Sequence, residues 1–238
     1  MRIVFKALAA AALLSAAAPA FAQEMVVTGS RRDANQGYVN GVIATGRPIV
    51  TLRRTADYAV QTVRVVGDTR DSEKRRTEVR ATVRNAIEAA GKAGVELSVG
   101  DYVLEPLTLA NYATLPMSGD GRADTDQTFF LAKVRLGPGV DDKAALARIA
   151  AFVAAVRREG RTTIQADGGL SLSVVNPDQY RKQIIKLIAA DAASSATEFG
   201  AGYGVEVTGL DRPVEWTRAS QTDVFLYLPA AYKVVPKN

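Results

Sequence analysis

The chain has 238 residues, with 30 Lys and Arg against 25 Asp and Glu, so its formal net charge is +5 at pH 7. It contains neither His nor Cys, which excludes Ser-His-Asp and Cys-His catalysis, zinc sites built from His or Cys, and disulfide bonds. The basic runs are bordered by acidic residues and form no basic cluster, so no nucleic-acid partner is expected.

The chain begins with the three parts of a cleavable secretory signal peptide, residues 1–22. Two basic residues precede an Ala/Leu run, and Ala20 and Ala22 present small side chains to signal peptidase. Cleavage there leaves Gln23 as the first residue and removes two basic residues and no acidic one. The alternative is an uncleaved membrane anchor, but this apolar run is shorter than the roughly 20 residues that cross a bilayer. The sequence predicts a periplasmic protein with no transmembrane helix after cleavage.

Residues 23–47 are rich in Gly, Asn, Arg and Ser and predict a flexible N-terminal arm. The first predicted strand-helix-strand unit follows. Strands are expected over 49–52 and 58–67, where β-branched residues are frequent. A helix begins at Asp71, carries an apolar stripe as far as Ala90, and is expected to stop at Gly91 and Gly94. The strands expected to close the unit are 95–99 and 102–107.

The second unit begins after a loop rich in Pro, Gly and Asp, residues 115–126. A strand is predicted over 129–136, followed by a helix that Asp141 and Asp142 start and that ends by Gly160. The apolar stripe of this helix, which is predicted to face the protein core, consists of Leu146, Ile149, Ala150, Val153 and Val156. An alternating strand follows at 170–175.

The third unit opens with the clearest local signal. Asn176-Pro177-Asp178-Gln179 combines an N-cap residue, a proline at the first helical position and a capping-box amide. The helix is expected to run to about Glu198, and strands to follow at 205–210 and 224–228. The fold class is therefore α+β, with strand-helix-strand units forming a mixed or antiparallel sheet and helices packed on one face. The aromatic residues expected in the core are Tyr180, Phe199, Tyr203, Trp216, Phe225 and Tyr227.

Three motifs that resemble chemical sites have simpler interpretations. The glycines of 200–204 close a helix instead of opening one, so they indicate a helix end and not a phosphate loop. The acidic loop 118–126 lacks the ligand order of a calcium-binding EF-hand and indicates a solvated hairpin. A Ser-Lys hydrolase is unsupported because no S-x-x-K motif is present. We expect no cofactor, no metal and no catalytic residue.

The segment Tyr180–Ala196, followed by Phe199-Gly200, Gly204–Val207 and Val224–Leu226, resembles the C-terminal part of SIMPL-domain proteins, an exported bacterial family. The resemblance spans about residues 56–236, although the glycine spacing after the helix differs from the family pattern. It implies an α+β domain over 48–238, homo-oligomerisation, and a role in stress defence or envelope interactions.

A second resemblance lies in Glu24–Arg31, which looks like the TonB box of outer-membrane receptors. Such a segment pairs as an added strand with the energy-coupling protein, so the residues implied to bind a partner are Val26, Val27, Thr28 and Gly29. The mature chain is too short for the receptor barrel of about 22 strands. Our hypothesis is a non-enzymatic periplasmic protein that acts by binding or oligomeric assembly. The alternative is a partner of the TonB system that docks through residues 24–31, and a third class, a hydrolase without His or Cys, lacks supporting motifs.

Overall fold

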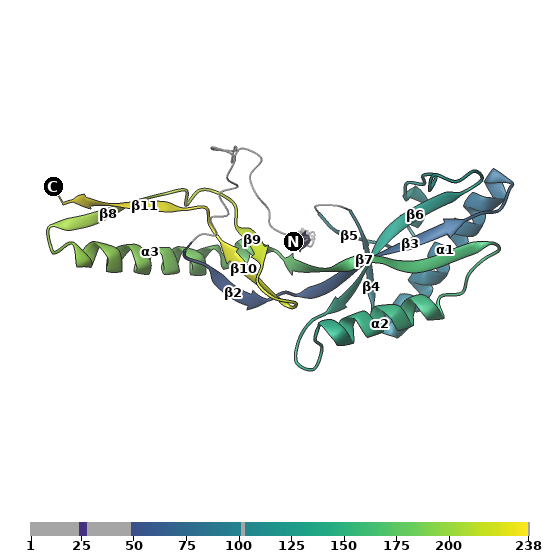
Figure 1. Ribbon diagram of the computed structural model, residues 1–238, viewed down its shortest axis with the longest axis horizontal. Coiled ribbons are helices and arrows are strands. Elements are labelled where there is room, and N and C mark those ends of the chain that lie inside the picture. The colour runs from purple at the N-terminus through teal and green to yellow at the C-terminus, as the bar shows by residue number, and fades with distance from the viewer. Residues whose placement is uncertain (1–23, 28–48, 101–102, 238) are drawn as a thin grey trace, which may run out of the picture.

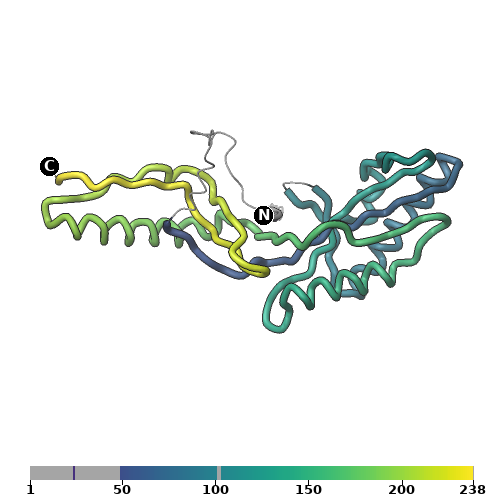
Figure 2. The backbone as a smooth tube through the Cα atoms, viewed as in Figure 1, coloured from purple at the N-terminus to yellow at the C-terminus, as the bar shows by residue number. Residues whose placement is uncertain are grey.

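The computed structural model describes residues 24–27, 49–100 and 103–237. The protein is elongated (Figure 1), with two ends that we call the body and the arm. The body contains a six-stranded sheet and two helices, and the arm contains one helix and a two-stranded sheet. A three-stranded sheet lies between them, and the backbone trace in Figure 2 shows how the chain passes through it from one end to the other.

All neighbouring strands of the body sheet are antiparallel, in the order β1-β7-β3-β6-β4-β5. The six strands are β1 (Glu24–Val27), β3 (Tyr58–Gly67), β4 (Glu96–Val99), β5 (Glu105–Pro106), β6 (Asp126–Arg135) and β7 (Thr162–Val175). The register places Tyr58 opposite Arg135 on one side and Ser173 on the other. The predicted strands 58–67 and 95–99 are thus present, and the strand predicted at 170–175 begins earlier, at Thr162.

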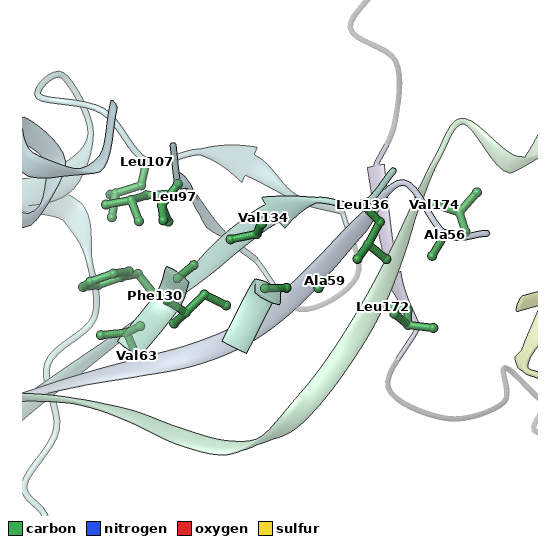
Figure 3. Close-up of a cluster of buried hydrophobic side chains, with 14 of the residues drawn as sticks. Ala56, Ala59, Val63, Leu97, Leu107, Phe130, Val134, Leu136, Leu172 and Val174 are labelled. Atoms are coloured by element: carbon green, nitrogen blue, oxygen red, sulfur yellow. The ribbon is translucent and has the colours of Figure 1, made fainter. Parts of the chain in front are cut away.

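Two helices cover one face of this sheet: α1 (Ser72–Ala93) and α2 (Asp142–Ala155). Along each strand of the sheet, residues that face the helices alternate with residues of the opposite face. Figure 3 shows part of the resulting core, in which Phe130 of β6 lies beside Val63 of β3. Val79 of α1 and Phe152 of α2 belong to the same buried cluster.

The starts of α1 and α2 were predicted correctly because capping is local. The carboxylates of Asp71 and Asp141 each accept a hydrogen bond from the backbone N–H three residues later, at 2.7 and 2.8 Å. The end of α1 differs slightly from the prediction, since Gly91 lies inside the helix and Gly94 alone ends it, with a φ of 65°.

The buried stripe of α2 also differs from the predicted one. Ala145, Ile149 and Phe152 are buried, whereas Leu146 is exposed. Alanine-rich helices leave several faces about equally apolar, so the choice of face depends on the packing partner. Here the larger Phe152, which is 1% exposed, determines which side faces the sheet.

The small middle sheet joins distant parts of the chain. Its strands are β2 (Leu52–Thr55), β9 (Glu215–Arg218) and β10 (Asp223–Tyr227), in the order β2-β10-β9. Trp216 and Tyr227 are buried, as predicted for the core. Strand β9 was not anticipated from the sequence.

The arm consists of α3 (Arg181–Glu198) and an antiparallel two-stranded sheet of β8 (Tyr203–Thr208) and β11 (Ala231–Pro236). The capping signal at Asn176 starts a short 3-10 turn, Pro177–Tyr180, directly before α3. The Asn176 side chain makes no capping bond, and its φ of 45° places it in the left-handed region. Strand β11 was also not anticipated.

The α+β class and the antiparallel pairing are confirmed. The helices do not share one sheet, however, because α3 packs on the two-stranded sheet of the arm while α1 and α2 pack on the body sheet. The predicted leader, residues 1–22, lies outside the described residues, and so do residues 23 and 28–47 of the predicted N-terminal segment. Among the residues described, no helix is both long and apolar enough to cross a bilayer.

Candidate functional site

The face of the body sheet opposite α1 and α2 carries a cluster of buried polar side chains. On β6, Lys133 alternates with Ala132 and Val134, which belong to the core. On β7, Ser173 stands between Leu172 and Val174 in the same way. Both polar residues are nevertheless buried, with Lys133 4% and Ser173 0% exposed. Something on this face must therefore cover and pair them.

Glu24 of β1 supplies that cover. One carboxylate oxygen of Glu24 forms an ion pair with Lys133 Nζ, and the other accepts a hydrogen bond from Ser173 Oγ at 2.6 Å. A second carboxylate, that of Glu96 on β4, lies 3.7 Å from Lys133 Nζ. Glu96 is more than half exposed, whereas the Glu24 side chain is 13% exposed. Glu24 is thus the principal counter-ion of the buried lysine.

Tyr58 of β3 completes the cluster. Lys133 Nζ lies 4.3 Å from the centre of its ring, and the guanidinium carbon of Arg135 lies 5.0 Å from it. The Tyr58 hydroxyl donates to Glu96 at 3.0 Å and accepts from Arg135 at 3.0 Å. Burial, and then the hydrogen bond and charge of Glu96, raise the pKa of Tyr58 above its ordinary value.

The cluster lies where the sheet curls so that its outer parts meet. The backbone N–H of Leu104, next to β5, donates to the carbonyl oxygen of Glu24 at 3.0 Å, and the two residues form an isolated antiparallel bridge. Strand β1 therefore has β7 on one side and Leu104 on the other. A cavity of about 750 Å³ opens beside this closure. Its lining combines Glu24, Glu96, Glu105 and Lys133 with Leu104 and Pro106.

The arrangement is suited to holding a strand in place. Lys133 Nζ is engaged by the carboxylates of Glu24 and Glu96 and by the face of the Tyr58 ring. Ser173 Oγ is fully buried and donates to a carboxylate. Among the residues described, no group of three or more acidic side chains is placed to hold a metal ion.

The residues predicted to bind a partner lie on or just after β1. In β1, Val26 pairs with Ser173 and Val27 with Leu172, both within the same chain. Thr28 and Gly29 lie outside the described residues. Partner binding by this segment stays a prediction, and the structure adds that its first four residues already pair with β7.

The other motifs have the local roles that the sequence indicated. Gly200 follows the end of α3 and has a φ of 101°. In the acidic loop, Arg122 donates to the Asp120 carboxylate at 2.9 Å, which together with Thr125 lowers the Asp120 pKa. Of the serines, Ser195 bonds the Tyr232 hydroxyl at 2.9 Å, and Tyr232 donates to Asp191, so this group fastens α3 to β11.

Sequence reasoning missed the cluster around Lys133. A lysine between two apolar residues of a strand is typical of a solvent-facing side. The available signal was the short strand-forming segment at Glu24, but nothing in its pattern identifies β7 as its neighbour. Two aromatic residues expected in the core, Phe199 and Tyr203, are instead 62% and 40% exposed at the arm.

Comparisons with known proteins add little. No family model matches the chain, and no curated protein matches it. One solved structure that it resembles weakly is that of an uncharacterized conserved protein from Listeria innocua. The two chains are 12% identical, the match covers 76% of this chain and 92% of the other, and the TM-score is 0.15. A score this low supports no shared fold or function.

Proposed function

We propose that the protein is exported to the periplasm and acts there without catalysis, by oligomeric assembly through its arm. The observation that carries this proposal is the incomplete sheet of the arm. Within the part of the chain described, β8 and β11 pair only with each other, although two-stranded sheets are marginally stable in water. A further strand from a second copy would satisfy an open edge.

The inner side of the arm is already used. Ile184, Ile188 and Ala192 of α3 are buried, and Tyr232 of β11 is bonded to the same helix. The outer side is polar, since Glu206 of β8 and Lys233 of β11 form an exposed ion pair at 2.7 Å. Association is therefore expected at the strand edges and at the end of the arm, not on its outer face.

Of the two edges, β8 is the better candidate for pairing. β11 contains Lys233 and Pro236, residues that natural sheets place on edges to prevent pairing. β8 contains neither lysine nor proline. Phe199 and Tyr203 lie where α3 passes into β8, with ring centres 5.9 Å apart. An exposed aromatic pair beside an open edge is typical of an association surface.

The test is the mass in solution of the chain from Gln23 to Asn238, measured by size-exclusion chromatography with light scattering. We expect an oligomer that the double substitution Phe199→Ser/Tyr203→Ser shifts towards monomer. Phe129→Ser is the matched control, because Phe129 is an exposed aromatic residue of the body, 41% exposed. A wild-type chain that is monomeric at all concentrations would overturn the proposal.

A second candidate function is docking to the TonB system through residues 24–31. The observation that favours it is that Glu24–Val27 adopts an extended strand conformation, the form that strand addition requires. Deleting residues 24–31 should abolish capture of the energy-coupling protein while light-scattering mass is unchanged. Capture that survives the deletion would exclude this candidate.

A further inference from the structure

We propose that the β7 edge, together with Lys133 and Ser173, is a receptor for an extended strand that carries a glutamate, and that the N-terminal strand of a second copy can take the place of the chain's own. The proposal goes beyond assembly through the arm because it uses the body and a different strand.

The receptor groups belong to the body and are already in place. Lys133 and Ser173 stand on β6 and β7, strands that are joined through β3 by long antiparallel ladders. Both side chains are buried and both donate to the Glu24 carboxylate. Without that carboxylate, and among the residues described, the ammonium group would keep only Glu96, at 3.7 Å, as an anionic partner. A buried ammonium group needs such a partner, so this site is selective for a strand with a carboxylate at this position.

The main chain of the bound strand is held from both sides. Four residues of β1 pair with β7 in continuous antiparallel register, from Glu24 opposite Val175 to Val27 opposite Leu172. On the other side, the N–H of Leu104 donates to the Glu24 carbonyl oxygen. Strand addition supplies affinity through such main-chain bonds and specificity through side-chain sites. Here the side-chain site is the pair Lys133 and Ser173.

The connection allows the occupant to be exchanged. β1 is the outermost strand of the sheet order, and the next described strand of the chain, β2, belongs to the middle sheet. The intervening residues 28–51 have a contour length of roughly 80 Å when fully extended. A connection of this length lets β1 of one copy make the same contacts on a second copy of the chain. The chain's own strand has the advantage of an effective concentration on the order of millimolar.

The test uses the full chain from Gln23 and a fluorescent peptide with the sequence of residues 23–31. A Glu24→Ala chain should bind this peptide, and should bind a peptide with Glu24→Gln roughly tenfold more weakly or worse, because a charged hydrogen bond is lost. Adding Lys133→Met to the chain should remove the difference between the two peptides. The unaltered chain should take up the acidic peptide only at millimolar excess, which tests exchange in a chain with no substitution.

Two results would overturn the receptor. One is equal affinity of the folded Glu24→Ala chain for both peptides, and the other is uptake of neither peptide by the Glu24→Ala chain and the unaltered chain alike. The peptide assay reports on β7, whereas the change in light-scattering mass caused by the double substitution Phe199→Ser/Tyr203→Ser reports on the arm. A monomeric chain that binds the peptide would therefore refute assembly through the arm and leave the receptor standing.

Discussion

Replacing Glu24 by glutamine removes the main counter-ion of a buried lysine while keeping the size of the side chain. The Lys133 side chain is 4% exposed and that of Glu24 13%. Breaking a buried ion pair by removing one partner costs about 3–5 kcal/mol. Glu96 and the Tyr58 ring remain near the ammonium group, so we expect the lower end of this range, about 3 kcal/mol.

Urea denaturation measures this loss directly. Trp216 is the single tryptophan of the chain and is buried, so its fluorescence reports unfolding. For a chain of this size, about 1 kcal/mol corresponds to about 2–4 °C in Tm. Glu24→Gln should therefore lower Tm by roughly 6–12 °C.

Two controls separate burial from charge. Glu206→Gln breaks an exposed ion pair, at 2.7 Å, in which Lys233 and Glu206 are 67% and 59% exposed, and should cost less than about 1 kcal/mol. The double substitution Glu24→Met/Lys133→Met removes both buried charges and should recover most of the stability. If Glu24→Gln costs no more than Glu206→Gln, then β1 does not hold the lysine in solution and the reasoning is wrong.

Three further predictions concern titration and packing. Burial and Glu96 raise the pKa of Tyr58. The contribution of its neutral hydroxyl to the free energy of unfolding is therefore present below about pH 10 and is lost as the pH rises through the folded-state pKa. The difference between the ultraviolet absorbance titrations of wild type and Tyr58→Phe should show that Tyr58 ionises late. Hydrogen bonding by Arg53 lowers the pKa of Asp223, so its contribution is present above about pH 3.9 and is lost as the pH falls through the folded-state pKa. Asp223→Asn should therefore reduce the acid sensitivity of stability, measured by urea midpoints across that range. Phe152→Ala should cost about 3–5 kcal/mol in urea denaturation, because Phe152 is 1% exposed in the core between α2 and the sheet. A loss below about 1 kcal/mol would contradict this packing.

Local signals predicted the parts of the fold that local physics determines. Asp71 and Asp141 start helices because a capping carboxylate needs only the next three residues. Strand β3 was found because β-branched residues are frequent in its sequence. Strand β9, with four residues, and β11, with Lys233 and Pro236, lack a strong pattern of their own. They are strands because a partner strand lies beside them.

Side-chain burial was predicted less well where the shape of the molecule decides it. Phe199 and Tyr203 have the composition of core residues, yet they lie at the arm, where one helix and two strands cannot surround them. A single packed body over residues 48–238 would have buried both. Their exposure is a consequence of the elongated arrangement, which no local pattern encodes.

The cluster around Lys133 shows the same limit in a single interaction. Glu24 and Lys133 are 109 positions apart, and each by itself suggests exposure, one in a segment rich in turn-forming residues and the other on the polar side of a strand. Only the sheet order, with β1 beside β7 and Leu104 closing on Glu24, brings them together. The carboxylate of Glu24 offsets the cost of burying Lys133. The ion pair in turn holds the short edge strand β1 in the sheet. A charged residue that interrupts an apolar strand is therefore better treated as half of a pair whose other half must be sought far along the chain.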